Sequence, residues 1–185
     1  MMRKVERDEI LDYQTWTEKR PQQLPRILEE KRKRRVHVGG DFTLLFENPV
    51  TVRYQVQEMM RVERMVKESD IRFELETYNE LLGGPGELGA TLLIELDDPA
   101  ERARRLVEWV GVQERIFVEV EAGERVFATF DPRQVGADRV SSVQFLKFAT
   151  RGRVPVAVGV DFPGLQFRTE LAPEQRSALG DDLKN

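Results

Sequence analysis

The apolar residues of this chain change their spacing near residue 110. Before that point they recur every three or four residues, which is typical of helices, and after it they recur every second residue, which is typical of strands. The pattern predicts an α+β protein in which N-terminal helices pack on a mostly antiparallel β-sheet formed largely by the C-terminal half. We expect a single domain over residues 1–185, with a helical arm at 1–35 and a frayed tail at 171–185.

Four helical segments are predicted in the first part of the chain. The first covers residues 6–33, where Pro21 and Pro25 are expected to separate two helices or to produce a kink. The others are predicted at residues 49–69 after the cap residue Asn48, at residues 71–82, and from Pro99 onward after the cap residue Asp98. The last helix should bury one stripe of side chains: Ala103, Leu106, Val107 and Val110.

Strands are predicted where short apolar runs or alternating patterns are bounded by turn residues. They are "FTLLFEN" from Phe42, "ATLLIEL" from Ala90, a hairpin over 116–130 with its turn at Ala122 and Gly123, "SSVQFLKFAT", and "VPVAVGVDF". In the last run, valines on one face alternate with Pro155, Ala157 and Gly159 on the other, so the face of small residues should pack closely against a neighbour. Pro155 itself indicates a strand end or an edge strand.

The helix predicted at 49–69 carries an acid within its apolar face. At about 100° per residue, Glu63 lies near the centre of the arc, Gln55 lies inside it and Glu58 lies at its margin. The apolar members of that arc are Val52, Val56, Met59, Met60, Val62 and Val66. A buried carboxylate needs a partner. We therefore expect Glu63 to meet an arginine in a buried pair, to lie at a helix-end crossing that leaves it partly wet, to serve as a metal ligand or general base in a cleft, or to lie at a subunit interface.

Other polar side chains are candidates for the same cleft, which would lie between this helix and the sheet. Glu47 ends a strand next to Asn48, where capping and site lining are alternatives. Tyr78 lies one helical turn from Glu74, in a spacing that fits a hydrogen-bonded cluster. The candidate ligand-binding residues are Glu47, Gln55, Glu58, Glu63, Tyr78 and Asp161.

Metal chemistry has few candidate ligands in this sequence. His37 is the only histidine, and a strand histidine that packs or faces solvent is the alternative to a ligand. The di-iron bundle pattern needs Glu-x-x-His on two helices. A single chain with one histidine cannot supply two such motifs, so this site is excluded on a single chain. Asp161, which precedes "FPG", is interpreted as a turn-initiating residue or as a carboxylate at the end of the sheet. Glu63 and His37 are the remaining metal-ligand candidates, and no cofactor is predicted.

Composition and charge restrict the classes of function. The absence of cysteine excludes disulfides and thiolate nucleophiles, and a formal net charge of −4 provides no overall field for nucleic acid or anionic membranes. The run "KRKRR" at 31–35 is interpreted as a solvated helix end, with nucleic-acid contact as the alternative. The charged amino terminus does not fit a signal peptide, and no segment approaches 18 apolar residues, so we expect a cytoplasmic protein without a membrane or nucleic-acid partner.

Several blocks of this sequence together resemble a known family. They are "TLLFENPVTVRYQVQEMMRVERM", "ELETYNELL", "ATLLIEL", "SSVQFLKF" and "VAVGVDFP", in order between about Leu11 and Pro163. The chain is identified as a member of an uncharacterised bacterial family classed only as a domain of unknown function, number 3501 in that series. The final block usually reads Asp-His-Pro in that family, whereas this chain has Asp161, Phe162 and Pro163. The missing histidine weakens a metal or proton-transfer role at that position.

The resemblance also implies a physiological setting. Genes of the family often lie beside genes for rubrerythrin-like and iron–sulfur proteins, which implies a link to redox or peroxide-stress systems and a partner of that kind. We therefore expect a non-enzymatic accessory or interaction protein that forms a homo-oligomer. The alternative is an enzyme that binds a small ligand or a metal in a carboxylate-lined cleft around the 49–69 helix.

Overall fold

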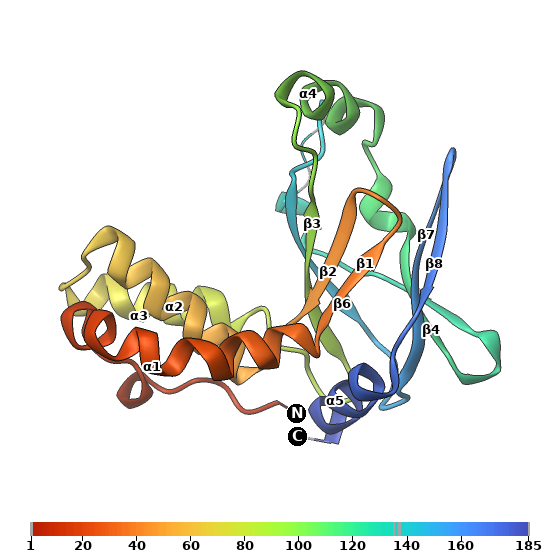
Figure 1. The fold of residues 1–185 in the computed structure, drawn as a ribbon. Helices are drawn as coiled ribbons and strands as arrows, with labels where there is room; N and C mark the ends of the chain where they lie inside the picture. Colours follow the sequence, from red (N-terminus) through yellow and green to blue (C-terminus); the bar gives the residue numbers. More distant parts are fainter. Residues whose placement is uncertain (1, 135, 137, 185) are drawn as a thin grey trace.

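The computed structural model describes residues 2–134, 136 and 138–184 (Figure 1). The helices are η1 (Arg7–Glu9), α1 (Tyr13–Arg32), α2 (Pro49–Glu63), α3 (Glu68–Asn79), α4 (Pro99–Glu108), η2 (Val112–Arg115), η3 (Glu121–Gly123), η4 (Pro132–Gln134) and α5 (Pro173–Lys184). The strands are β1 (Arg35–Val38), β2 (Phe42–Phe46), β3 (Leu88–Ile94), β4 (Ile116–Val120), β5 (Arg125–Phe127), β6 (Val143–Phe148), β7 (Pro155–Phe162) and β8 (Leu165–Glu170). These elements confirm the predicted α+β class. No helix in the described part of the chain is both long enough and apolar enough to cross a membrane.

The strands form two antiparallel sheets, where the sequence had indicated one. One sheet has the order β1-β2-β3-β6 and the other has the order β5-β4-β7-β8. Their edges meet on both sides: Thr129 pairs with Lys147 as an isolated bridge, and the Thr169 hydroxyl donates to the His37 carbonyl at 2.9 Å. The two sheets therefore enclose one core, and periodicity alone could not distribute the strands between them.

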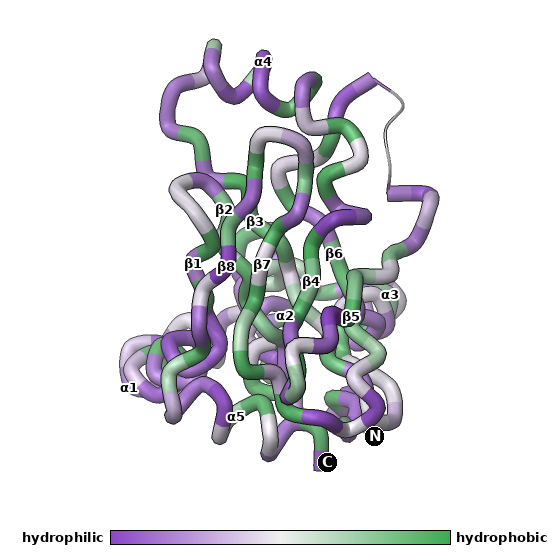
Figure 2. Tube along the Cα trace, turned by 90° about the vertical axis from the view of Figure 1, so that its right-hand side faces the viewer, coloured by the Kyte–Doolittle hydropathy of each residue, from purple (hydrophilic) through white to green (hydrophobic). Residues whose placement is uncertain are grey.

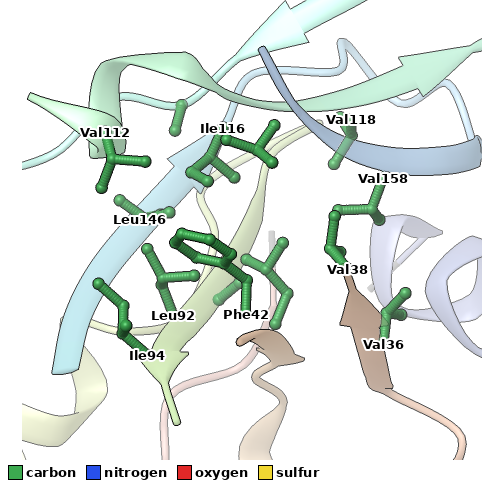
Figure 3. Close-up of a cluster of buried hydrophobic side chains, with 14 of the residues drawn as sticks. Val36, Val38, Phe42, Leu92, Ile94, Val112, Ile116, Val118, Leu146 and Val158 are labelled. Carbon is green, nitrogen blue, oxygen red and sulfur yellow. The ribbon is translucent and has the colours of Figure 1, made fainter. Parts of the chain in front are cut away.

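The main hydrophobic core lies between the two sheets. Figure 3 shows side chains of the first sheet facing those of the second across this space. Val36, Val38, Phe42, Leu92, Ile94 and Leu146 come from the first sheet, and Ile116, Val118 and Val158 come from the second, with Val112 of η2 beside them. Figure 2 shows mostly hydrophobic residues along strands such as β4 and β7 and mostly hydrophilic residues along α4.

A second hydrophobic cluster holds the helices together beside the first sheet. It joins the N-terminal segment to α2, α3 and the residues that follow α3. Its buried members are Met2, Val5, Ile10, Val52, Val56, Met60, Ile71, Leu75, Leu81 and Leu82. In Figure 1 the helices α1, α2 and α3 extend away from the sheets as one layer, so the helical arm includes α2 and α3 as well as the predicted residues 1–35.

Two predictions about helix bounds were wrong. The segment predicted at 6–33 contains one long helix, α1, which continues through Pro21 and Pro25 instead of dividing there, and the alternative of a kink stays a prediction. Both prolines are exposed, so the carbonyl groups that lose an intrahelical donor can bond to water instead. The helix α2 ends at Glu63, because Arg64 takes a left-handed conformation with φ of 50° and ends the helix there.

The buried stripe of α4 was also predicted incorrectly. Leu106 is buried, and Trp109 packs against Phe42 with ring centroids 5.1 Å apart, but Ala103, Val107 and Val110 are exposed. The helix lies across one end of the sandwich (Figure 1), and therefore it buries only its last turn.

In the C-terminal segment, where at most a short helix and a frayed end were expected, a helix of 12 residues is present. The residues 173–184 form α5, in which Ala178, Leu179 and Asp182 are buried, while residue 185 lies outside the described residues. The strand β8 was not predicted, although Leu165 and Phe167 alternate with Gln166 and Arg168, and most of its side chains are exposed. The face of small residues on β7 does pack closely as predicted: a Cβ built on Gly159 would lie 2.3 Å from Cζ of Phe117.

Candidate functional site

The structure places Glu63 on the surface and not in a cleft. The buried residues of α2 are Thr51, Val52, Val56, Gln57 and Met60. Glu63 has the direction that the helical wheel gives it, but it belongs to the last turn, at the outer end of the helical layer. Its neighbours there, Val62 and Val66, are 63% and 78% exposed. Water therefore solvates the carboxylate, and the expected buried partner is not needed.

The buried polar residues of α2 are Thr51 and Gln57, and neither was among the predicted site residues. Gln57 is bonded to the backbone of Leu11. Its Oε1 accepts from the amide of Leu11 at 2.8 Å and its Nε2 donates to the Leu11 carbonyl at 3.0 Å. Gln57 therefore satisfies the backbone of the segment that leads into α1. Gln55 is partly exposed, and its side chain forms no hydrogen bond with a described residue.

Glu58 fastens α1 to α2. It accepts from Nε1 of Trp16 at 2.9 Å, from Nε of Arg20 at 2.8 Å, and from Nη2 of Arg61 at 3.1 Å. Partial burial alone would raise the pKa of this carboxyl, but the hydrogen bonds from Arg20, Arg61 and Trp16 outweigh it and lower the pKa to about 2. Glu58 therefore stabilises the helical layer through two arginines and an indole.

Glu47 is a deeply buried carboxylate, with 1% of its surface exposed. Its Oε1 accepts from the Thr91 hydroxyl at 2.6 Å and its Oε2 accepts from the Thr51 hydroxyl. Burial raises the pKa of this carboxyl, and the two hydroxyl donors and the charge of Lys31 offset only part of that effect. Glu47 thus joins the end of β2 to the first turn of α2 and to β3.

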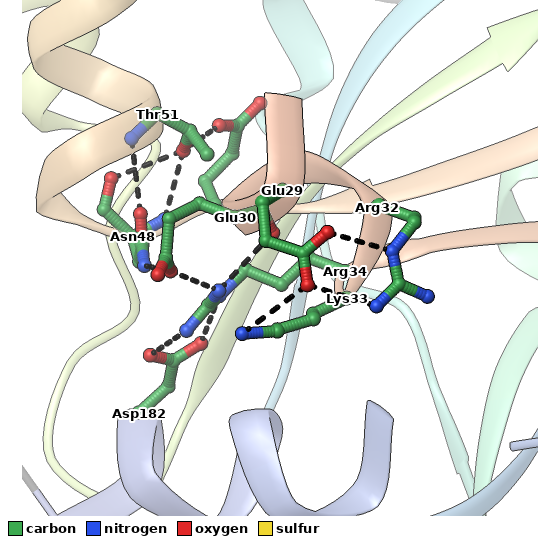
Figure 4. A network of polar contacts seen from close by, with 9 residues as sticks. Glu29, Glu30, Arg32, Lys33, Arg34, Asn48, Thr51 and Asp182 are labelled. Atoms are coloured by element: carbon green, nitrogen blue, oxygen red, sulfur yellow. Dashed lines mark hydrogen bonds and ion pairs between the residues drawn. The ribbon is translucent and has the colours of Figure 1, made fainter. Parts of the chain in front are cut away.

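A second buried polar cluster connects α1 to the C-terminal helix (Figure 4). Arg34 donates from Nε to Oδ2 of Asp182 at 2.8 Å, from Nη2 to Oδ1 of Asp182 at 3.0 Å, and from Nη1 to Oε2 of Glu30 at 2.6 Å. Glu30 also accepts from Nδ2 of Asn48 at 3.4 Å. The interpretation of "KRKRR" as a solvated helix end was therefore wrong for Arg34, which is buried.

Lys31 differs from a solvated lysine as well. Its Nζ lies 4.4 Å from the ring centroid of Tyr54, and burial lowers its pKa although the carboxylates of Glu47 and Glu58 act in the opposite direction. The sequence carries no signal that selects Lys31 or Arg34 from five consecutive basic residues, because the contacts that distinguish them, with Tyr54 and Asp182, come from other segments of the chain.

A cavity lies beside Tyr78, between α3 and β6. Its volume is about 720 Å³, and it is bounded by the N-terminal segment, by α3 and the turn after it, by residues 129–134, and by β6. The lining residues are Met2, Lys4, Glu74, Thr77, Tyr78, Asn79, Glu80, Leu81, Leu82, Gly83, Gly84, Thr129, Phe130, Asp131, Gln134, Phe145, Leu146 and Lys147. Of the predicted site residues, Tyr78 alone lines this cavity.

Tyr78 supplies an uncommitted polar group to the cavity. Its hydroxyl forms no hydrogen bond with a described residue. Burial raises the pKa of the phenol, and the carboxylates of Glu74 and Glu47 raise it further, so the hydroxyl stays protonated at neutral pH. In contrast, the amide of Asn79 is fully used, since it bonds the amide and the carbonyl of Val5 at 2.8 and 2.9 Å.

The remaining candidates lie elsewhere on the molecule. His37 is exposed on β1, where its Nδ1 lies 2.8 Å from the Thr43 hydroxyl, which donates to Glu95 at 2.5 Å. Asp161 lies in β7 rather than at the turn, and its Oδ2 accepts from Nη1 of Arg125 at 3.0 Å. The single carboxylate-lined cleft predicted around α2 is therefore not formed. No group of three or more His, Asp or Glu side chains within the described residues could hold a metal ion.

Replacing Glu47 with glutamine is expected to have an effect that grows with pH. The pKa of Glu47 is raised above its ordinary value in the folded protein. The native state therefore binds the proton more tightly than the unfolded chain does, and the wild type loses stability as pH rises through the folded pKa. Urea unfolding should show Glu47→Gln gaining stability relative to the wild type between pH 4 and pH 8.

Glu58→Gln is the matched control with the opposite sign. The folded pKa of about 2 lies below the ordinary value of 4.5, so the stability that Glu58 contributes is present above pH 4.5 and is lost as pH falls toward 2. The variant should lose about 2 kcal/mol at pH 7 and less at low pH. An effect of Glu47→Gln that is the same at every pH would contradict the raised pKa.

Comparisons with known proteins identify relatives whose own functions are not established. The family model described as "Protein of unknown function (DUF3501)" matches residues 4–183, which confirms the resemblance seen in the sequence blocks. A crystal structure from Burkholderia pseudomallei K96243, described as a novel protein of unknown function, is similar with a TM-score of 0.88 and 29% identity. The match covers 98% of this chain and 100% of that chain. No curated protein matches.

Proposed function

The chain belongs to the family of unknown function DUF3501, and on that premise we propose that it is a small-molecule-binding protein whose ligand occupies the cavity beside Tyr78. The cavity itself carries the proposal. A volume of about 720 Å³ falls within the range of small-molecule sites, which are typically apolar with a few convergent polar groups. The role in redox or peroxide-stress systems that the resemblance implies stays a prediction.

The chemical character of the lining supports binding. Leucine and phenylalanine side chains provide apolar surface, notably Leu81, Phe130 and Phe145. Phe145 is 37% exposed although it lies on a sheet, and a ligand in the cavity would bury more of this ring. Tyr78 lines the same cavity, and its hydroxyl bonds no described residue.

The environment of Glu47 does not suit a catalytic role. Both oxygens of Glu47 accept hydrogen bonds from threonine hydroxyls, and the carboxyl has almost no exposed surface. A general base must reach the proton that it abstracts. Glu47 therefore acts as a structural support behind the cavity, where it contributes to the raised pKa of Tyr78.

The variant Thr77→Trp should abolish ligand binding, because its indole ring would fill the cavity. Thr77 lies on the exposed side of α3, lines the cavity and bonds the Phe73 carbonyl at 2.8 Å. Ligand-observed NMR with a library of aromatic and aliphatic fragments should detect binders to the wild type that no longer bind Thr77→Trp. Amide signals of Thr129 and Lys147 should shift when these fragments are added to the wild type.

Thr17→Trp is the matched control for that experiment. Thr17 is also an exposed helical threonine that bonds the carbonyl four residues earlier, Tyr13, at 2.6 Å, but it lies on α1 outside the cavity. This variant should bind the fragments as the wild type does. Binders that are unaffected by Thr77→Trp, or a library without any binder, would overturn the proposal.

A further inference from the structure

The charges around the cavity are not equally available to a ligand. Lys147 is paired with Glu87, with Nζ 4.0 Å from Oε2. Asp131 is held by Arg133, whose Nε lies 2.8 Å from Oδ2. These pairs neutralise one cation and one anion of the lining.

Two carboxylates and one ammonium group remain. Glu74, Glu80 and Lys4 form no salt bridge with a described residue, although the charge of Glu80 acts on the Arg133 guanidinium and helps to raise its pKa. Glu74 is partly buried and lies one turn before Tyr78 on α3, close enough for its charge to act on the phenol. The uncommitted charge of the cavity is therefore negative and is concentrated at α3 and the turn after it.

Aromatic rings reinforce the preference for positive charge. Tyr78, Phe130 and Phe145 all line the cavity. The face of an aromatic ring carries partial negative charge and attracts an ammonium group, whereas it gives no such attraction to a carboxylate or phosphate. Aromatic faces beside unpaired carboxylates are the usual arrangement for recognising organic amines.

We infer that the ligand is an organic monocation, an ammonium group attached to an apolar body, with Glu74 and Glu80 binding the ammonium group and the apolar lining of the cavity binding the body. This inference rests on the proposed function, because it assigns the chemistry of a ligand in the same cavity. The apolar lining fits an aryl or alkyl body, and one ammonium group balances the excess negative charge.

Three probes with the same apolar body test the inference: 2-phenylethylamine, 2-phenylethanol and 3-phenylpropionate, which are cationic, neutral and anionic at pH 7. Titrations of the full chain should be followed by the amide shifts of Thr77 and Lys147. The amine is expected to bind most tightly. The double variant Glu74→Gln/Glu80→Gln should weaken the amine about fivefold and leave 2-phenylethanol unchanged.

Glu76→Gln is the matched control, because Glu76 is exposed on the same helix but does not line the cavity. It should leave amine binding unchanged. Tighter binding of the anion or the alcohol, or an amine affinity that the double variant does not change, would overturn the inference while the cavity still binds ligands. If Thr77→Trp does not affect any of the three probes or any library fragment, the proposed function fails as well.

Discussion

Replacing Arg34 with alanine is expected to lower the free energy of unfolding by about 3–5 kcal/mol. The guanidinium is buried and donates to both oxygens of Asp182 and to Glu30. Alanine would leave the carboxylate of Asp182 buried without its counter-ion, and this uncompensated charge accounts for most of the loss. Urea or guanidinium unfolding followed by circular dichroism at pH 7 measures the change directly.

Arg32→Ala is the control for Arg34→Ala. Arg32 also pairs with two carboxylates, Glu29 and Glu174, but its side chain is 54% exposed. Because exposed ion pairs contribute little, this variant should lose about 1 kcal/mol or less. Equal losses in the two variants would contradict the role of burial.

A double replacement separates the charge effect from the loss of packing. Arg34→Met/Asp182→Leu removes both buried charges and keeps apolar volume at both positions. It should be clearly more stable than Arg34→Ala, because no unpaired buried charge remains. If it is as unstable as Arg34→Ala, the shape of the polar cluster matters more than its charge.

Gly89→Ala is expected to destabilise the fold by about 3 kcal/mol and to disturb the candidate site. A Cβ at position 89 would lie 1.7 Å from the carbonyl oxygen of Leu81, in the segment that follows α3 and lines the cavity. The backbone of β3 has little freedom to move away, since the Gly89 carbonyl accepts from the amide of Glu47 at 2.9 Å and Gly89 is paired with Lys147. Thermal and chemical unfolding measure the loss.

Gly40→Ala is the matched glycine control. Position 40 is exposed, and a Cβ there would meet no atom within 4 Å. The variant should differ from the wild type by about 0.5 kcal/mol or less. A Gly89→Ala variant as stable as Gly40→Ala would mean that the segment after α3 is free to shift, and the cavity lining would then be adaptable rather than fixed.

The candidate site could be predicted only in part. Tyr78 was selected because it lies one turn from Glu74, and both residues do line the cavity. The opposite wall was not predictable, since Lys4, Phe130 and Phe145 are brought to α3 by pairing between distant segments. Glu63 shows the converse error: the helical wheel gives the direction of a side chain, but not whether another element covers it.

The sequence by itself determined most of the elements and the family. Local effects act within a few residues, so the caps at Asn48 and Asp98, the hairpin turn near Ala122 and Gly123, and the alternation in β4 and β7 were all readable from the sequence. The sequence blocks quoted above likewise indicated a family, and the family model that matches residues 4–183 confirmed it.

Only the tertiary structure decided which polar groups are buried and where a ligand could bind. Arg34 meets Asp182 across 148 positions of sequence, and Glu47 meets Thr91 across 44. The split into two sheets, the docking of α5 and the cavity beside Tyr78 have the same origin. Burial and pairing depend on which elements lie next to each other, and local sequence patterns do not specify this arrangement.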